Sequence, residues 1–245
     1  MEHEFEPTGY FNSFGSHEPV LTIASGDRVR TSTADAFGNG RDGSPVATRG
    51  NPLTGPFLVE GAEPGDVLVV RLESIVPNRD HGYTISSIAT HLVDADYTSE
   101  LPARERVTWS VDVAAGVATL SDEAATPREV EVALRPMLGC IGVAPAGGQA
   151  ISTATSGPYG GNMDYREVEP GATVMLPVFV PGALFFVGDG HAVQGEGEIV
   201  GTGIEISMDV AFSVELVKSS DVAGAVRWPR METATHLIAL GNARP

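Results

Sequence analysis

IEISMDVAFSVEL, residues 204–216, alternates apolar and polar side chains with a period of two. One side of this stretch is apolar at every position: Ile204, Ile206, Met208, Val210, Phe212, Val214 and Leu216. The other side is mostly polar: Glu205, Ser207, Asp209, Ser213 and Glu215. Successive side chains of a β-strand point to opposite faces, so this pattern predicts a strand with one buried face.

Turn sequences bound further strands on either side of this one. EPGDVLVVRLESIVP (63–77) begins with the turn residues Pro-Gly-Asp, and EPGATVMLPVFVPGALFFVGDGH (169–191) contains Pro-Gly twice. Such units predict a β-rich α+β fold, with an antiparallel β-sandwich or barrel-like core and few short helices. Only RMETATHLIALG (230–241) has the apolar spacing of a helix, with Gly241 as its stop.

The domain boundary is weakly marked. TLSDEAATPR (119–128) is rich in small and polar residues and separates a β-rich half, residues 1–125, from a second β-rich half, residues 126–245. The second half carries the main candidate loops. A single intertwined domain remains the alternative.

Composition excludes several classes of partner. The 245 residues include 15 basic and 32 acidic side chains, a net charge of −17, which disfavours nucleic acids and anionic membranes. Cys140 is the only cysteine, so no internal disulfide can form. The first residues lack the pattern of a signal peptide, and no apolar run is long enough to span a bilayer. We expect a cytoplasmic, soluble protein.

Two glycine-rich loops concentrate side chains that could bind a metal, GPYGGNMD (157–164) and GDGHAVQGEGE (188–198). Their candidate ligands are Asp164, Asp189, His191, Glu196 and Glu198. Carboxylates combined with an imidazole suit zinc or another first-row divalent metal. Solvated turns between strands have the same composition, so both interpretations stay open at this point.

Five segments, in the same order along the chain, resemble the acetamidase/formamidase family of amide hydrolases: SGDRVRTSTADAFGNG (25–40), RPMLGCIGVAP (135–145), GPYGGNMD (157–164), LPVFVPGALFFVGDGHAVQGEGE (176–198) and GTGIEI (201–206). The resemblance implies hydrolysis of a small amide, such as formamide or acetamide, to the carboxylic acid and ammonia. It also implies a β-rich α+β fold and a divalent metal, with zinc as the first choice.

The resemblance also implies roles for particular residues. The expected metal ligands are Asp35, Asp164, Asp189 and His191. The chemistry of the residue types, apart from the resemblance, suggests Glu198 or Glu196 as the source of the proton for the departing ammonia. It also suggests Asn162 as a hydrogen-bond donor to the oxyanion. We also expect self-association, as a homodimer or a larger homo-oligomer, because this is common among soluble proteins. Compared with the family, we expect a C-terminus shorter than in most members.

Two other classes of function fit the same loops. A cupin-like metal oxygenase or isomerase also places histidine and glutamate on a β-hairpin, but it usually needs a second histidine near His191. A non-catalytic β-module could bind calcium or a small ligand through the acidic loops, and calcium would leave the imidazole unused.

Overall fold

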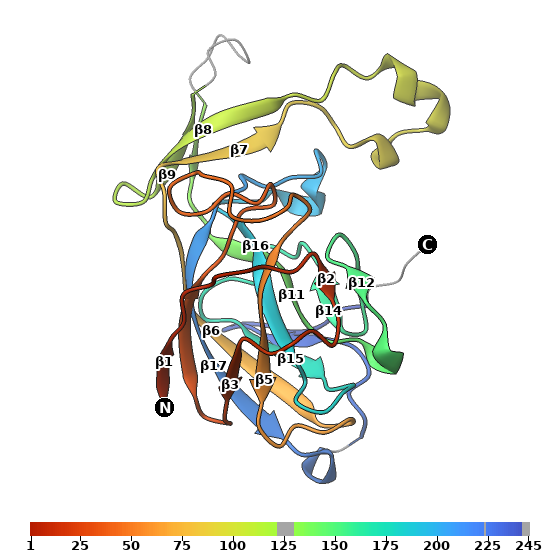
Figure 1. Ribbon diagram of the computed structural model, residues 1–245. Helices are drawn as coiled ribbons and strands as arrows, with labels where there is room; N and C mark the ends of the chain where they lie inside the picture. The colour runs from red at the N-terminus through yellow and green to blue at the C-terminus, as the bar shows by residue number, and fades with distance from the viewer. Residues whose placement is uncertain (122–129, 223, 242–245) are drawn as a thin grey trace.

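The computed structural model describes residues 1–121, 130–222 and 224–241, and these fold mainly into β-sheets (Figure 1). Each helix in the described part of the chain is a short 3₁₀ helix: η1 (Thr90–Leu92), η2 (Ala95–Glu100), η3 (Ala146–Gly148), η4 (Glu196–Glu198) and η5 (Ser219–Asp221). The predicted β-rich fold with few short helices is confirmed. The sheets are open and packed face to face, as in a sandwich.

The first large sheet has seven strands in the order β1-β4-β17-β6-β15-β18-β19. Their bounds are β1 (Glu2–Glu4), β4 (Arg28–Ser32), β17 (Met208–Val217), β6 (Val67–Pro77), β15 (Thr173–Pro177), β18 (Arg230–Glu232) and β19 (Leu237–Ala239). All neighbours pair antiparallel except β1 and β4, which run parallel. The long pair β6 and β17 forms the centre of this sheet.

The second large sheet has six strands in the order β13-β14-β11-β16-β5-β3. Their bounds are β13 (Ser156–Gly157), β14 (Gly160–Asn162), β11 (Met137–Val143), β16 (Phe185–His191), β5 (Leu53–Val59) and β3 (Leu21–Ile23). Every residue of β11 and β16 is buried. Phe212 of the first sheet meets Phe57 and Phe185 of the second, with ring centroids 5.4 and 5.2 Å apart, so the core lies between the two sheets.

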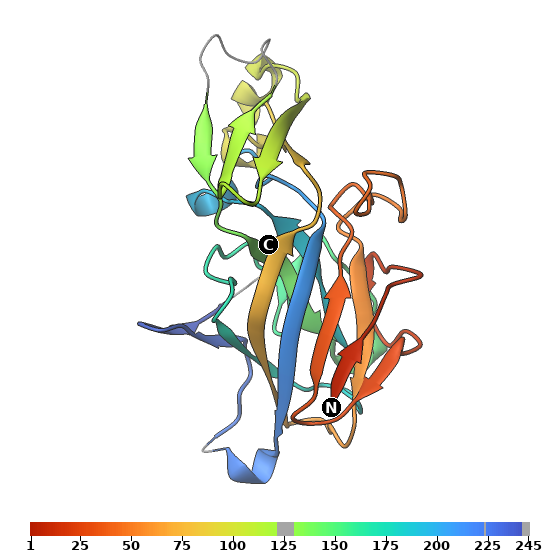
Figure 2. The same cartoon turned by 90° about the vertical axis from the view of Figure 1, so that its left-hand side faces the viewer.

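A smaller sheet projects from one end of the sandwich (Figures 1 and 2). Its order is β10-β9-β8-β7, with bounds β10 (Glu131–Ala133), β9 (Val117–Leu120), β8 (Arg106–Asp112) and β7 (His81–Ile85). A short pair, β2 (Ser13–Phe14) and β12 (Ile151–Ser152), packs elsewhere on the body. A bridge between Tyr83 of β7 and Glu205 joins the projecting sheet to the sandwich.

The strand predicted at 204–216 is confirmed as β17 over Met208–Val217, where alternate apolar residues are buried. The preceding residues differ from the prediction, because Glu205 and Ser207 are as buried as their apolar neighbours, with 2% and 0% of their surface exposed. Residues 204–207 pass between the projecting sheet and the sandwich, so neither side of this segment faces solvent. The polar residues of 204–207 therefore point into the protein.

The helix predicted at 230–241 is wrong. This segment forms the hairpin of β18 and β19, and β18 pairs with β15 through Thr173 and Glu232. The open edge of β15 offers backbone hydrogen bonds, and that tertiary pairing overrides the helical spacing of the apolar residues.

The proposed boundary between residues 125 and 126 lies outside the described residues. Both large sheets take strands from each side of it. Among the residues that the structure does describe, no helix combines the length and the hydropathy that a membrane span requires.

Candidate functional site

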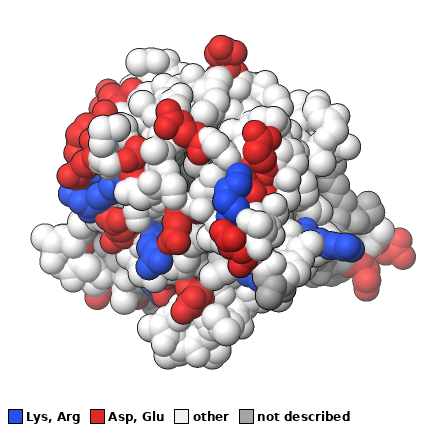
Figure 3. All heavy atoms as spheres, turned by 90° about the horizontal axis from the view of Figure 1, so that it is seen from below, with Lys and Arg blue, Asp and Glu red and all other residues white. Residues whose placement is uncertain are grey.

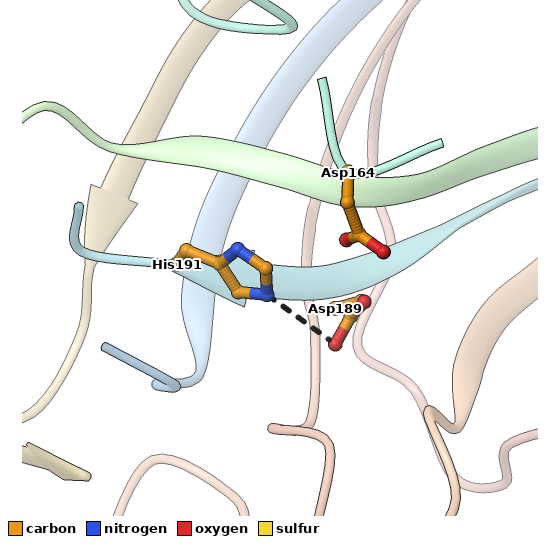
Figure 4. Close-up of side chains that lie close together, drawn as sticks. All are labelled: Asp164, Asp189 and His191. Carbon is orange, nitrogen blue, oxygen red and sulfur yellow. Dashed lines mark ion pairs between the residues drawn. The ribbon is translucent and has the colours of Figure 1, made fainter. Parts of the chain in front are cut away.

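A group of acidic side chains surrounds one buried imidazole at the end of β16. Asp189 and His191 lie on β16, and Asp164 follows β14. Figure 4 shows these three side chains close together, with the Nε2 of His191 3.7 Å from Oδ1 of Asp189. One potential ligand atom from each residue lies within 4.8 Å of the other two. Two loops far apart in the sequence therefore form one centre.

A second group shares the same imidazole. The Oε1 atom of Glu205 lies 3.1 Å from Nε2 of His191 and accepts a hydrogen bond from the backbone N–H of Gly203. Glu198 of η4 completes a group in which the ligand atoms of His191, Glu198 and Glu205 lie within 4.8 Å of one another. Four carboxylates thus converge on His191; we call these five side chains the acid cluster.

Gln194 orients the imidazole. Its Oε1 atom lies 2.9 Å from Nδ1 of His191, and its Nε2 atom donates to the backbone carbonyl of Asp164 at 2.6 Å. An amide oxygen can only accept, so Nδ1 of His191 carries a proton. In the neutral imidazole the free lone pair then belongs to Nε2, which faces the carboxylates.

Two asparagines tie the carboxylates to one another. The side-chain amide of Asn51 donates to Oδ1 of Asn162 at 2.9 Å and to Oδ2 of Asp189 at 3.1 Å. Asn162 in turn donates from Nδ2 to the carboxylate of Asp164. Asn162 therefore positions a carboxylate of the cluster, and one N–H of its amide remains for another acceptor.

Glycines allow the backbone to approach the cluster closely. A Cβ atom on Gly139 of β11 would lie 2.5 Å from Oδ1 of Asp164 and 2.7 Å from Oδ2 of Asp189. A Cβ atom on Gly203 would lie 2.6 Å from Cγ of His191. Both contacts are shorter than van der Waals distance, so glycine is required at both positions.

The backbone around the cluster is strained. Of the six non-glycine residues with positive φ in the described chain, four belong to this site: Asn51 (52°), Asp164 (43°), Asp189 (57°) and Glu198 (44°). Such conformations cost about 1–3 kcal/mol each and persist only where the surrounding structure enforces them. Three of these residues belong to the acid cluster, and the fourth, Asn51, donates to Asp189 of the cluster and to Asn162.

Burial and mutual repulsion shift the titration of the cluster. Burial raises the pKa of Asp164 well above its ordinary value, and the charge of Asp189 adds to this shift. Burial raises the pKa of Glu205 to about 7 and also raises the pKa of Glu198, although His191 opposes both shifts. Burial lowers the pKa of His191, but the charges of Glu205 and Asp189 outweigh it, and the pKa is raised well above its usual range. The cluster holds more negative charge than one imidazolium can balance.

The cluster leaves buried polar atoms without hydrogen-bond partners. Within the described chain, Oδ1 of Asp164, Nε2 of His191 and Oε2 of Glu205 are such atoms. The short distances from Nε2 to carboxylate oxygens lack hydrogen-bond geometry and are ion-pair contacts only. Unpaired buried polar atoms are costly unless a ligand satisfies them. Two oxygens and one nitrogen with available lone pairs are a donor set that fits a divalent cation such as zinc.

Asp35, which the resemblance suggested as a metal ligand, lies outside both groups of ligand atoms. Its carboxylate accepts from Nη2 of Arg79 at 2.6 Å and from the backbone N–H groups of Phe37 and Asn39, each at 2.9 Å. These bonds occupy its oxygens. Asp35 shapes the 35–39 turn, which carries Phe37 to the mouth of the site.

Glu196 and Glu198 lie in the same 3₁₀ turn but face different surroundings. Glu198 is partly buried and belongs to the cluster. The Oε1 atom of Glu196 lies 2.7 Å from Nε of Arg166, and 71% of the side chain is exposed. The structure therefore brings Asp164, Asp189, His191, Glu198 and Asn162 together, but not Asp35 or Glu196.

Three residues of the site were not predicted. The alternation of 204–216 predicts a solvent-facing Glu205. Gln194 stands in GDGHAVQGEGE, where a substrate contact and a turn-stabilising role fit its amide equally well, and nothing in the sequence marks Asn51. The sequence holds one signal for Glu205. In GTGIEI this carboxylate stands between two isoleucines and shortly after two glycines. Asn51 reaches the site only through the fold.

A cavity of about 330 Å³ opens beside the cluster. Its floor includes Asp189, Glu198 and Glu205, and its walls include Phe37 and Arg49. Binding sites for small ligands range upward from about 300 Å³. The acid cluster is therefore accessible to a small molecule.

Together the fold and the site define a β-sandwich protein with a buried acid and imidazole centre that opens on a cavity. The chain belongs to the Acetamidase/Formamidase family, whose sequence profile matches residues 16–148 and 146–236. This confirms the resemblance seen in the sequence.

Named relatives share both the sequence and the fold. The chain is 28% identical over 221 residues to the acetamidase of Mycolicibacterium smegmatis, covering 68% of this chain and 53% of that protein. It is 25% identical over 250 residues to the formamidase of Methylophilus methylotrophus, covering 81% of this chain and 61% of that protein. The crystal structure of a predicted acetamidase/formamidase from Thermoanaerobacter tengcongensis superposes with a TM-score of 0.79 and 30% identity, covering 96% of this chain and 74% of that one. The chain thus spans little more than half the length of the two named enzymes.

Proposed function

We propose that this protein hydrolyses small carboxamides, such as formamide or acetamide, to the carboxylate and ammonia, and that it needs a divalent cation, with zinc as the first candidate. One observation carries the proposal. Within the described chain, a cluster of four carboxylates and one imidazole contains three buried polar atoms without partners, and three of its carboxylates, Asp189, Glu198 and Glu205, line a cavity of about 330 Å³. The family membership supports the choice of an amide as substrate.

The residues that would hold the cation are those with the unpartnered atoms, His191 through Nε2 together with Asp164 and Glu205, and their neighbour Asp189. When bound, such a cation polarises a carbonyl and lowers the pKa of water toward about 7. Gln194 keeps the lone pair of His191 on the side of the carboxylates.

Glu198 is the residue best placed to move protons. It lies at the edge of the cluster and lines the cavity, and burial raises the pKa of its carboxyl. A carboxyl with a raised pKa can hold a proton near neutral pH and donate it to the amide nitrogen as the C–N bond breaks. Water contributes OH to the acyl carbon and its other proton to the nitrogen, and the carboxylic acid so formed returns a proton to Glu198, so that the products are a carboxylate and ammonium.

Asn162 would stabilise the negative charge that develops on the substrate oxygen. It lines the cavity, and one of its amide N–H groups is free of the bond to Asp164. A well-placed donor of this kind stabilises an oxyanion by about 3 kcal/mol. The bond from Asn51 holds the Asn162 side chain in a fixed orientation.

The test is ammonia release from formamide and acetamide by the purified chain, with metal content measured on the same sample. We expect release that disappears on chelation, returns with added zinc, and follows the amount of bound metal. Hydrolysis that continues in a sample free of metal would refute the cation requirement. A metal-loaded sample that releases no ammonia from either amide would refute the proposed activity.

A further inference from the structure

The cavity beside the acid cluster is larger than the simplest amides require. Its volume of about 330 Å³ equals about eleven water molecules at about 30 Å³ each. Formamide has three non-hydrogen atoms and acetamide has four. The space beyond the reacting amide is lined by Phe37, Ile85, Arg49 and Arg104, so it could receive the remainder of a longer substrate.

Three arginines lie in or near the lining of this cavity. Arg49 and Arg104 line it, and Arg106, at the start of β8, lies 5.8 Å from the ring centroid of Phe37, which also lines it. In the described part of the chain, no carboxylate oxygen lies within ion-pair distance of any of them, although acids outnumber bases by 32 to 15. Acidic side chains are spread over other faces, as Figure 3 shows for one of them. Three cations without acidic ion-pair partners in the described chain therefore lie beside one cavity, whose acids belong to the acid cluster.

The guanidinium groups are held in place without using up their capacity to bind an anion. Arg49 lies over the ring of Phe37, 4.2 Å from its centroid, and Arg106 lies 5.5 Å from the ring centroid of Tyr83. Arg104 donates to the carbonyls of Ser87 and Val200 at 3.0 and 2.6 Å.

A guanidinium has five N–H donors in a flat array that matches a carboxylate. None of the N–H groups of Arg49 donates to another described residue, so all of them remain available. Stacking on an aromatic ring fixes the plane of the group and reduces the entropy lost when it binds an anion.

We propose that the preferred substrates are amides that carry a carboxylate at the end opposite the amide, such as the monoamide of a four-carbon dicarboxylic acid. This inference rests on the proposed amide hydrolysis. The amide would lie at the acid cluster, and the substrate carboxylate would pair with Arg49, assisted by Arg104. The acid cluster repels the carboxylate, so it also directs which end of the substrate lies at the floor. Salt screens the overall charge of −17 beyond about 8 Å, and the local arginines then determine the preference.

The experiment compares kcat/KM for succinamate with that for butanamide, which matches it in length and lacks the charge. We expect succinamate to be preferred about 10- to 100-fold, the range of a charge-assisted hydrogen-bonded pair, and less at high salt. The variant Arg49→Gln should lower this preference at least 10-fold, and Arg104→Gln should lower it by less. Arg71→Gln is the control, because Arg71 is 62% exposed on β6 and pairs with Glu215 away from the cavity.

Other outcomes separate this inference from the proposed function. Equal kcat/KM for the two amides, or an unchanged preference in Arg49→Gln, would overturn the inference and leave amide hydrolysis intact. If neither amide is hydrolysed, thermal stabilisation by succinamate provides the second measurement. A shift that is lost in Arg49→Gln would support anion recognition without the reaction, and no shift with succinamate would overturn it. If Arg49→Gln weakens inhibition by acetate but leaves the preference for succinamate unchanged, Arg49 binds the carboxylate of the product. That result would overturn the inference.

Discussion

In the sheet around β17 the buried side chains are apolar and alternate with polar ones, whereas at the end of β16 the buried side chains are carboxylates around one imidazole. The first region has regular backbone geometry apart from one register shift between Ala211 and Phe212. The second has positive φ at four polar residues and glycines where no Cβ fits. Local rules of stability hold in the sheet and are broken at the cluster, as is usual where a protein binds a ligand.

The pKa values of acids in the two regions are also shifted in opposite directions. Burial raises the pKa of Asp66 at the base of the sheet, but Lys218 and backbone N–H groups outweigh it, so the pKa is lowered. The pKa values of Asp164, Glu198 and Glu205 are raised. Lys218 and backbone N–H groups therefore stabilise the charged form of Asp66. The carboxylates of the acid cluster are stabilised instead by protons or by a bound cation.

The largest effect should follow from His191→Ala. The variant should lose its bound cation, and amide hydrolysis should fall at least about 10⁴-fold, because a lowering of the pKa of water by about 8 units would be lost with the cation. Metal analysis and ammonia release on the same sample measure both effects. His236→Ala, in the exposed turn of the β18–β19 hairpin, should retain both. A fully active His191→Ala protein would show that the cluster is only a structural feature.

In the sheet, Phe212→Ala should reduce stability rather than chemistry. Phe212 is fully buried between Phe57 and Phe185, and removal of such a ring costs about 3–5 kcal/mol of unfolding free energy. Ser213→Ala, one position along the strand and partly exposed, should change stability by less than about 0.5 kcal/mol. Urea unfolding measures both. Equal losses in the two variants would contradict the alternation that defines this strand.

The sheet could be predicted from the sequence because its interactions follow from local patterns. The alternation of 204–216 and the Pro-Gly turns before Val67 and after Pro177 identify β17, β6, β15 and β16. The 230–241 segment was assigned wrongly because its apolar spacing suits a helix, while its partner, β15, lies far away in the sequence. Edge pairing of this kind cannot be read from a single segment.

The cluster could be predicted only in part. Asp164, Asp189 and His191 stand in two motifs whose glycines already indicate unusual backbone geometry. Glu205 continues a regular strand pattern that predicts a solvent-facing side chain, but its segment bridges both Tyr83 of the projecting sheet and His191 of β16, and Glu205 is buried. Asp35 and Glu196 show the converse, since both are acids in suitable motifs, but arginines occupy their carboxylates.

A smaller effect, the dependence of the free energy of unfolding on pH, should also distinguish the two regions. In protein stripped of metal, Glu205 has a pKa of about 7 in the folded state and an ordinary value near 4.5 when unfolded. Between these values the folded state binds more protons, so the free energy of unfolding should fall as pH rises from 4.5 to about 7. The raised pKa values of Asp164, Glu198 and His191 act in the same direction.

Urea midpoints at several pH values, with chelator present, measure this slope. Glu205→Gln should flatten it, because glutamine does not titrate. Glu215→Gln, an exposed acid on β17, should leave it unchanged. Protein loaded with zinc and measured without chelator should also show a flatter slope, since the bound cation replaces the protons. A stability that rises with pH across this range would contradict the raised pKa values and remove the contrast with Asp66.

The smallest effect on hydrolysis is expected for Glu196, which lies outside the acid cluster but in the same turn as Glu198. Glu196→Gln should change hydrolysis less than about twofold, because its carboxylate forms an exposed ion pair with Arg166, and such pairs contribute about 0–1 kcal/mol. Glu198→Gln, two residues further on, should lower kcat about 10²- to 10⁴-fold, the usual contribution of a general acid. Both replacements keep the size of the side chain and remove its carboxyl group, so they differ only in surroundings. If Glu196→Gln is the more damaging variant, the proton donor is the exposed acid, and burial beside His191 is not what prepares a carboxyl of this turn for proton transfer.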